Sequence, residues 1–395
     1  MRIRSTKITE HNHRKVLDLL EKCFPNASRE YFEKHHRCDP SYKFEQGHVF
    51  SDGDRIVSHV QVFHREMSWF KSSIPYGGIA DVATDPEYRN LGLSRKLLDK
   101  SLLYMTKASL PLSVLFTRNL SHYEHHGWVS VPTYIIELEV PSIQPSHPEG
   151  FEVTAVKPHH IPVLYKLYKH QTARLVGPEI RSEGYMHGQS EWLEAKGAVR
   201  WDVINSGGRP VGYVRTRMEG NILHLLDMCS NTIDTDQFAL ATILQHAASH
   251  DCTSVHIAAI PDSHFANTVT STTDYKIVIN PDRMIRINNL GHLFERILPE
   301  TPHQSKNPSL INPFTLQVAD ESVHIDPSGH RPKISTQSNS SPIATMSAGT
   351  FLNILFGQQN SGPLPSDLEG DPAAINALLR LFPKSGNIMW RADRF

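Results

Sequence analysis

The sequence predicts an α+β protein in which a strand–helix unit occurs twice and is followed by a separate α+β region. The stretch "ADVATDPEYRNLGLSRKLLDKSLLYM" (residues 80–105) passes from a β-like run through a glycine-containing loop into a helical pattern. The order strand, polar loop and helix in residues 2–24 recurs in residues 151–172, which indicates a weak internal duplication. A third pattern of helices and strands begins near residue 284. The length of 395 residues agrees with two or three domains.

The first unit is expected to contain strands on both sides of the glycine loop. Residues 2–8 fit a strand and residues 13–24 fit a helix with one apolar face. Residues 48–69 read as two or more strands joined by a turn at Asp52 and Gly53. Further elements after residue 105 are a strand, a short helix closed by glycine and another strand, at 112–117, 118–128 and 133–140.

The proline-containing stretch "EVPSIQPSHPEG" (residues 139–150) is predicted to be a linker, after which the pattern begins again. Strands are expected around the turn at Gly207 and Gly208, but the strand that follows runs into a helix without a glycine loop. The second unit is therefore expected to lack a ligand site of the kind predicted in the first. The predicted domains are residues 1–148, 149–283 and 284–395.

The third region is expected to begin with a helix over residues 284–298. Two strands follow in the prediction, and the serine-rich residues 329–343 are expected to form a mobile loop or the end of a hairpin. The apolar periodicity then predicts two more helices. The predicted strands are 313–320 and 322–326, and the predicted helices are 347–357 and 371–382.

The composition argues against several functional classes. The formal net charge is −1, so neither nucleic acid nor an anionic membrane is an expected partner. The four cysteines form no C-x-x-C pair, the N-terminus has no apolar signal core, and no apolar run reaches the roughly 18 residues of a membrane span. We therefore expect a cytoplasmic protein. The 24 histidines show no convincing metal-ligand spacing, and most are expected at the surface, including the pairs His35–His36 and His159–His160.

The glycine loop has the chemistry of an anion site. The first turn of a helix leaves backbone N–H groups unpaired, and the helix dipole adds partial positive charge there. Gly92 allows close approach to the backbone, Ser94 is small, and Arg89 adds a positive charge, so a pyrophosphate fits. An ordinary strand-to-helix loop would have the same short pattern, so the loop alone is weak evidence. The predicted cofactor-binding residues are Val82, Ala83, Thr84, Arg89, Asn90, Leu91, Gly92, Leu93 and Ser94.

Two motifs in order carry a family resemblance. The pattern Val82-x-Thr84-x-Pro86-x-x-Arg89-x-x-Gly92-x-Ser94 resembles the acetyl-coenzyme A signature of the GNAT acetyltransferases. The later "HYEHHGW", with Tyr123, Gly127 and Trp128, resembles that family's second motif. The whole chain is similar to the Eis (enhanced intracellular survival) family, and the "LFP" at Pro383 and the ending W-x-x-D-x-F add to the likeness. This resemblance implies an active GNAT domain, a degenerate GNAT-like domain and a C-terminal domain like sterol carrier protein.

The resemblance also implies roles at the reaction centre. Backbone groups at Val82 and Thr84 would hold the pantetheine arm and polarise the thioester. Tyr123 would be the general acid, because a phenol with a pKa near 10 can pass its proton to a thiolate. The carboxylate of Phe395 would be the base. Asp81 remains open as an alternative base, and so do the histidines near Tyr123, which are His122, His125 and His126.

The predicted activity is transfer of an acetyl group from acetyl-CoA to a primary amine of a small molecule or peptide, with broad acceptor tolerance. Two alternatives are an acetyltransferase with one narrow acceptor and a non-catalytic module that keeps coenzyme A as a regulatory ligand. No metal is expected, and the protein is expected to form a homo-oligomer.

Overall fold

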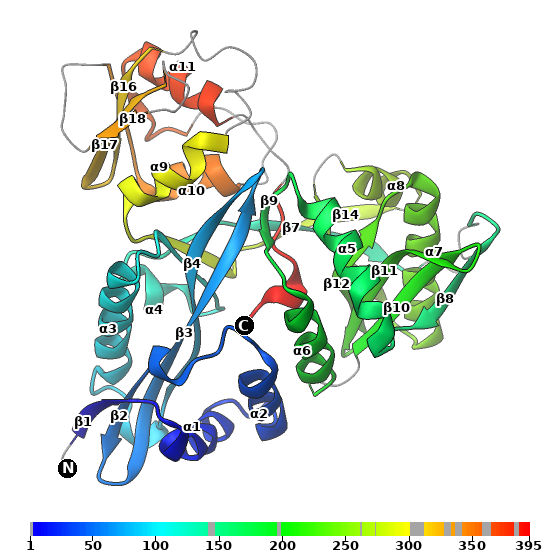
Figure 1. The fold of residues 1–395 in the computed structure, drawn as a ribbon, viewed down its shortest axis with the longest axis horizontal. Helices are drawn as coiled ribbons and strands as arrows, with labels where there is room; N and C mark the ends of the chain where they lie inside the picture. Colours follow the sequence, from blue (N-terminus) through cyan, green and yellow to red (C-terminus); the bar gives the residue numbers. More distant parts are fainter. Residues whose placement is uncertain are drawn as a thin grey trace.

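The structure is a computed structural model that describes residues 3–140, 147–195, 199–260, 263–272, 274–300, 312–327, 333–335, 342–357, 365–382 and 387–395. The described strands form three sheets, each with its own helices (Figure 1). No helix among these residues is both long enough and apolar enough to cross a membrane.

The first sheet contains the glycine loop. Its strand order is β1-β2-β3-β4-β5-β15-β6, and β9 adds to β3. These strands are β1 (Ile3–Lys7), β2 (Gly47–Asp52), β3 (Arg55–Trp69), β4 (Ser72–Thr84), β5 (Leu112–Phe116), β6 (Val129–Ser130), β9 (Val176–Glu179) and β15 (Arg283–Ile287). Its helices are α1 (Glu10–Cys23), α2 (Arg29–Cys38), α3 (Leu93–Lys107) and α4 (Leu120–Glu124), with short 3-10 turns η1 (Phe44–Gln46) and η2 (Pro86–Tyr88).

The second sheet repeats this arrangement. Its order is β14-β7-β13-β12-β11-β10-β8, and it is flanked by α5 (Ile161–Thr172), α6 (Glu183–Glu194), α7 (Ile233–Ser249), α8 (His264–Thr272) and the turn η3 (Pro158–His160). Its strands are β7 (Thr133–Glu139), β8 (Phe151–Ala155), β10 (Val199–Ser206), β11 (Arg209–Glu219), β12 (Ile222–Ser230), β13 (Ser254–Ala258) and β14 (Tyr275–Asn280). The predicted duplication therefore corresponds to two sheets of matching strand order.

The two sheets exchange strands. The strand β7 follows β6 in the chain and would be expected in the first sheet. It lies instead between β13 and β14 of the second sheet. In return, β15 leaves the second unit and lies between β5 and β6 of the first. Sheet membership thus departs at both strands from the linear boundaries 1–148, 149–283 and 284–395. Sequence patterns do not show this exchange because β7 and β15 have ordinary strand patterns and their partners are distant in the chain.

The third sheet has the order β18-β17-β16-β19-β20, and its helices pack toward the far end of β3 and β4 (Figure 1). Trp69 of β3 donates its indole N–H to the carbonyl of Ile297 (2.9 Å) and packs edge-on against Phe356 and Phe382. The third unit therefore shares a core with the first. Its elements are β16 (Phe314–Val318), β17 (Glu321–Asp326), β18 (Lys333–Ser335), β19 (Ile343–Met346), β20 (Glu369–Gly370), α9 (Leu290–Ile297), η4 (Leu298–Glu300), α10 (Ala348–Phe356) and α11 (Pro372–Leu381).

Most predicted elements are confirmed, but the helix predicted over residues 284–298 is wrong in its first half. Residues 283–287 form β15, and the helix begins only after the cap at Asn289, whose side chain accepts from the backbone N–H of His292. Within residues 329–343, β18 is described and much of the remainder lies outside the described residues, as do residues 141–146 of the predicted linker and Pro383.

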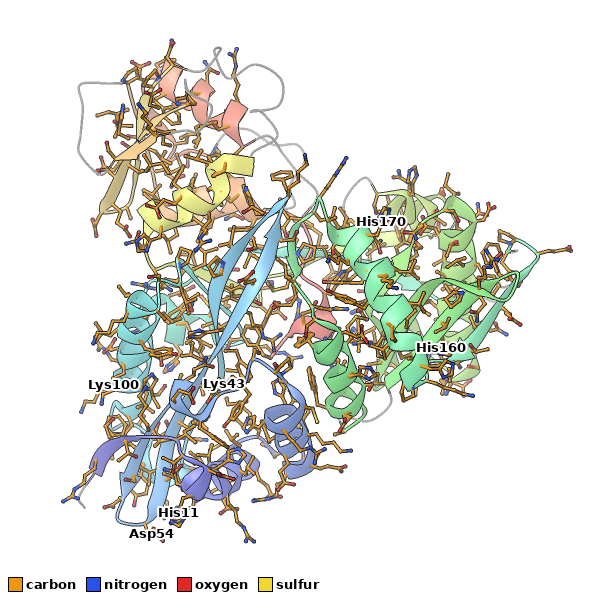
Figure 2. All side chains as sticks on the ribbon, viewed as in Figure 1. His11, Lys43, Asp54, Lys100, His160 and His170 are labelled. Atoms are coloured by element: carbon orange, nitrogen blue, oxygen red, sulfur yellow. The ribbon has the colours of Figure 1, made fainter. Side chains whose placement is uncertain are left out.

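The histidines divide between surface and core. His11 and His170 are exposed and lie at the periphery (Figure 2), and His159 is exposed as expected. The expectation that His35 and His36 lie at the surface is wrong, because both are buried where α2 packs on the sheet.

Candidate active site

The strand β4 leaves its neighbour β5 partway along its length. The parallel pairing of β4 with β5 covers Tyr76 to Gly78, whereas β4 continues to Thr84. Beyond Gly78, the β5-facing backbone of β4 therefore has no partner in β5. A register shift against β3 and a positive φ of 53° at Asp81 mark a bulge in the same segment. The residues predicted to hold the pantetheine arm, Val82 to Thr84, follow this bulge directly.

The glycine loop ends at an uncapped helix. Gly92 is the N-cap of α3, with φ 69° and no side-chain hydrogen bond to the first turn. Asn90 also has a positive φ, of 63°, so the loop turns sharply before the helix. Arg89, Asn90 and Leu91 are exposed, and Leu93 is buried beneath the loop. Backbone N–H groups at such a turn form a concave site for an anion.

Close packing holds α3 on the sheet. A Cβ on Gly77 would lie 2.1 Å from the sulfur of Met105, so a larger residue at this position of β4 would require the Met105 side chain of α3 to move. Leu97 and Leu98 are also fully buried on this face. The apolar face predicted for the helix thus fixes the loop relative to the open part of β4.

Ser94 and Tyr123 belong to one local cluster. The hydroxyl of Ser94 and Nε2 of His122 are 3.0 Å apart, and His122 packs edge-on against Tyr123. Tyr123 lies on α4 with its ring against Trp128. Burial raises the pKa of Tyr123 to about 12, so the phenol is protonated at neutral pH. Two sequence-distant motifs are therefore brought together at the start of α3.

The carboxylate of Asp81 is already bound within the protein. Nε2 of His36 donates to Oδ2 of Asp81 (2.9 Å), and Nδ1 of His36 lies 2.9 Å from Nε2 of His13. Burial favours a raised pKa for Asp81, but the hydrogen bond and charge of His36, with the imidazoles of His35 and His59, bring the pKa below its usual value. The Asp81 carboxylate is therefore stabilised in its ionised form by contacts within the protein. His36 connects it to the half-buried His13.

Phe395 lies inside the first unit, next to the bulge. Its ring is 6.0 Å from the ring of Phe63 and 5.7 Å from that of Phe116. A Cβ on Gly78 would be 2.5 Å from Cζ of Phe395. The ring of Tyr42, stacked on His36 at 4.2 Å, continues this aromatic cluster through Phe63. Both candidate bases, Phe395 and Asp81, therefore adjoin one group of rings beside β4.

The segment that leads to Phe395 is anchored mainly by the second unit. Both carboxylate oxygens of Asp393, in the turn η7 (Arg391–Asp393), accept from Arg181 at 2.8 Å, and all of these side-chain groups are buried. Arg391 forms two 3.0 Å hydrogen bonds with Glu219, and Arg394 pairs with Asp282. Bidentate arginine–carboxylate pairs fix orientation as well as distance.

Two further ionisable side chains around Phe395, Arg65 and, through Tyr76, Glu179, are not predicted from the sequence. The guanidinium of Arg65 lies 5.2 Å from the centre of the Phe395 ring and pairs with Asp39. Glu179, on the crossing strand β9, is buried and accepts from the hydroxyl of Tyr76. Burial raises the pKa of Glu179 to about 8. The sequence "VGPE" does not indicate a role for Glu179, because Glu179 meets Tyr76 only after β9 has paired with β3 of the first sheet.

The second unit has no equivalent anion site at the corresponding helix. Thr232 caps α7, and its side chain accepts from the backbone N–H of Thr235 (3.1 Å). Asp234 and Asp236 lie in the first turn of α7, where their negative charges would repel a phosphate. The start of α7 therefore differs from the glycine loop of the first unit in both its cap and its charge.

The first unit thus brings together the separated strands β4 and β5, the glycine at the start of α3 and the tyrosine motif. Residues 3–131 match the family model described as "Acetyltransferase (GNAT) domain", so this part of the chain belongs to the GNAT acetyltransferases, as predicted. A comparison with curated proteins finds no match.

Solved structures share the fold over the whole chain. A GCN5-related N-acetyltransferase from Anabaena variabilis has 17% identity and a TM-score of 0.76, and a probable N-acyltransferase from Enterococcus faecalis has 18% and 0.76. Eis1 from Mycobacterium abscessus has 10% identity and a TM-score of 0.68. Each comparison covers 100% of both chains. At these identities the likeness establishes the fold alone, and the fold agrees with the predicted tandem of GNAT-like units.

Proposed function

We propose that the protein transfers an acetyl group from acetyl-CoA to a primary amine. The observation that carries the proposal is that the β5-facing edge of β4, which has no partner in β5 after Gly78, leads to the start of α3 at Gly92. An extended pantetheine arm would pair with the first, and the pyrophosphate would bind the second. The GNAT match to residues 3–131 supports acyl transfer in general.

The chemistry assigns two proton transfers. The amine attacks the thioester carbon, the C–S bond breaks, and Tyr123 supplies the proton to the leaving thiolate. Burial raises the pKa of Tyr123 to about 12, and burial of a thiol also raises its pKa above the usual value of about 8.5. Because burial raises the pKa of both the Tyr123 phenol and the thiol, the difference between them stays small, and this limits the free-energy cost of proton transfer from Tyr123 to the thiolate.

We assign the amine proton to the carboxylate of Phe395. Asp81 is less suited as the base, because His36 stabilises its charged form and lowers its pKa. The tight anchoring of Asp393 supports a fixed position for the segment ending in Phe395. A carboxylate there would also attract an ammonium group by its charge.

The proposed acceptor is a broad set of amines on small molecules or peptides. A narrow-acceptor acetyltransferase and a regulatory module that only binds coenzyme A are the alternatives. A thiol-release assay with polyamines, aminoglycosides and lysine peptides distinguishes the three. Activity with several classes supports the proposal, activity with one class supports the narrow enzyme, and coenzyme binding without release supports the module. Replacing Tyr123 with Phe is expected to lower turnover by about 10²-fold or more, as for loss of a general acid.

Three accompanying proposals concern the rest of the chain. The third unit is assigned a sterol-carrier-protein-like fold on its mixed sheet and its helices α10 and α11. A reducing, cytoplasmic compartment is supported by the four unpaired cysteines. A homo-oligomer is supported by β14, the outermost strand of the second sheet, whose Tyr275, Ile277 and Ile279 are 49%, 49% and 58% exposed.

Light scattering tests the oligomer. If β14 lies in the interface, Ile277→Lys is expected to yield a smaller species, whereas Leu103→Lys, at an exposed position on α3, is expected to leave the mass unchanged. A monomeric parent protein would contradict the proposal.

A further inference from the structure

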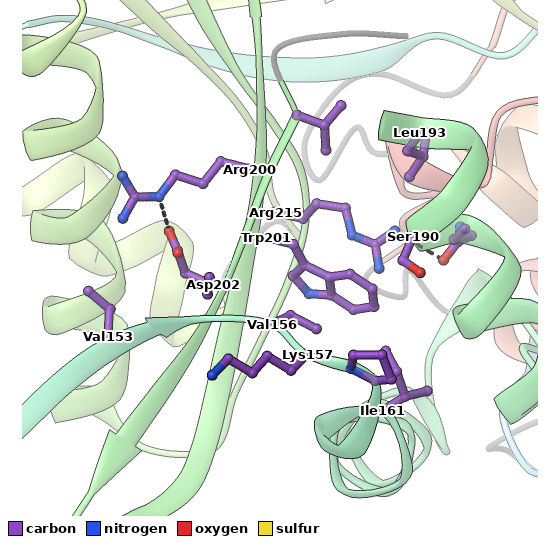
Figure 3. Close-up of a pocket in the computed structure, with 14 residues that line it drawn as sticks. Val153, Val156, Lys157, Ile161, Ser190, Leu193, Arg200, Trp201, Asp202 and Arg215 are labelled. Carbon is purple, nitrogen blue, oxygen red and sulfur yellow. Dashed lines mark hydrogen bonds and ion pairs between the residues drawn. The ribbon is translucent and has the colours of Figure 1, made fainter. Parts of the chain in front are cut away.

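A cavity of about 550 Å³ lies in the second unit, away from the GNAT loop. Strands β8, β10 and β11 and helices α5 and α6 surround it (Figure 3). Its volume lies within the range of small-molecule sites. Much of its wall is apolar, and these residues are Val153, Ala155, Val156, Pro158, Ile161, Leu193, Val199 and Trp201.

Arg215 gives this cavity a buried cation with spare hydrogen-bonding capacity. The side chain is 1% exposed, and its guanidinium lies 3.6 Å from the centre of the Trp201 ring. Nη1 donates to Oε1 of Gln189 (3.0 Å), and Nε lies 3.3 Å from a carboxylate oxygen of Asp227. Nη2 has no hydrogen-bond partner among the described residues. A buried donor without a partner is unfavourable, so an acceptor at Nη2 would stabilise the site.

The charges around the cavity favour an anion. Asp227 is shared between Arg215 and Arg181, and Arg181 also pairs with Asp393, so these four groups balance one another. At the rim, Arg200 pairs with Asp202. The remaining lining charge is the exposed Lys157, which has no ion pair among the described residues. A ligand with one negative charge would complete the balance.

We propose that this cavity binds an organic monocarboxylate with an apolar body. The carboxylate accepts from Nη2 of Arg215, Lys157 adds attraction at the entrance, and the valine-rich wall covers the apolar part. A polyphosphate fits less well, because a single buried donor group and one lysine offer too few partners. The cavity lies beside β8, β10 and β11 rather than at the start of α7, so it does not duplicate the coenzyme site of the first unit.

The proposed ligand would also adjoin the anchor of the C-terminal segment. Gln189, which accepts from Arg215, donates through Nε2 to the carbonyl of Ala392 (2.9 Å) and to Oδ1 of Asp393 (3.2 Å). Occupancy of the cavity is therefore expected to change turnover through the position of Phe395. This second step depends on the proposed role of Phe395, whereas binding itself does not.

Calorimetric titration of the full chain with 4-phenylbutyrate and with its neutral amide tests the site. We expect the acid to bind at least tenfold more tightly than the amide. Val156→Trp, which fills the cavity from a half-buried position, should abolish binding. Lys157→Ala should weaken the acid several-fold, and the matched control Lys169→Ala, on the exposed face of α5, should not. If Val156→Trp fails to fold, the lysine pair still decides the question.

No binding of the acid by the parent, equal affinity for acid and amide, or unchanged binding by a folded Val156→Trp would each overturn the proposal. The coupling to Phe395 is tested by acetyl transfer with and without the acid. A change in turnover in the parent but not in Val156→Trp supports it. Binding of the acid without any change in turnover refutes the coupling but still supports the binding site. A protein that binds the acid but has no transferase activity refutes the proposed function and not the binding site.

Discussion

Gly78 of β4 and Phe395 are in van der Waals contact, so closely that a Cβ on Gly78 would lie 2.5 Å from Cζ of the Phe395 ring. Gly78 is also the last residue of β4 that pairs with β5. The ring of Phe395 therefore packs against β4 at the residue where β4 and β5 separate. Gly78 therefore lies between the proposed base and the beginning of the proposed coenzyme groove.

Gly78→Ala is expected to displace Phe395. Overpacking of this kind destabilises a protein by about 1–3 kcal/mol. Turnover should fall at least tenfold, since the carboxylate of Phe395 moves with the ring, while coenzyme affinity, set at Gly92, should change little. Steady-state kinetics and coenzyme titration measure the two effects. Gly184→Ala is the control, because its nearest contact would be an ordinary 3.9 Å. Equal turnover in Gly78→Ala and Gly184→Ala would argue against a catalytic Phe395.

A residue added after Phe395 should move the charged group away while the ring stays in place. We expect turnover to fall by 10² or more and coenzyme binding to persist. Deleting Phe395 should have the same effect on turnover, with an additional loss of stability from the missing ring contacts. Turnover that survives both changes would transfer the role of base to Asp81, to Glu179 or to a histidine beside Tyr123.

Gly92→Val and Gly53→Val form a matched pair for the coenzyme site. Both glycines have a positive φ, 69° and 58°, and a Cβ at either position would meet no atom within 4 Å. Each substitution should therefore destabilise the fold by a similar amount, about 1–2 kcal/mol for a left-handed residue. Coenzyme affinity should fall at least tenfold in Gly92→Val alone, because the side chain occupies the approach to the loop. Similar affinity in both variants, measured by calorimetry, would place the phosphates elsewhere.

Acid is expected to destabilise the protein through neutral buried histidines. His59 is fully buried, its Nδ1 donates to the carbonyl of Asp81 (2.9 Å), and burial lowers its pKa from 6.5 to about 4. Between these values the unfolded chain binds the proton and the folded chain does not, so stability falls as pH falls through this window. The contribution of one such histidine is about 2 kcal/mol between pH 8 and pH 5.

Urea unfolding at pH 8 and pH 5 measures this loss in stability. His59→Asn keeps a donor for the carbonyl of Asp81 and should reduce the difference between the two pH values by about that amount. His170→Asn, at an exposed position, should leave the difference unchanged. A His59→Asn variant with the same pH dependence as the parent would show that His59 does not contribute.

The local structure around the proposed site could be predicted where it lies within one stretch of sequence. The strand, the loop from Arg89 to Ser94 and the helix that follows are predicted by glycine placement and helix periodicity, and the short helix of Tyr123 is predicted by a motif. The structure adds that Ser94 and Tyr123 meet through His122. Such local patterns suffice because the strand, loop and helix fold as one unit.

The parts that depend on distant contacts could not be predicted. His36 reaches Asp81 because α2 packs on the sheet, and strand alternation alone does not predict the bulge at Asp81. Arg181 meets Asp393 across 212 positions of the chain. The predicted helix includes residues 284–287, yet pairing with β5 and β6 of the first sheet makes them part of the strand β15. Tertiary pairing outweighs local preference in each case.

The exchange of β7 and β15 has a consequence for synthesis on the ribosome. When residues up to 148 have been made, the first sheet still lacks β15, and the edge of β5 that β15 will cover is open to other strands. That edge closes only after the whole second unit has been translated, and the ring that fills the space beside Gly78 arrives with the last of the described residues. The nascent chain therefore carries an unfinished sheet through most of its elongation, a period in which chaperones are its protection against misassembly.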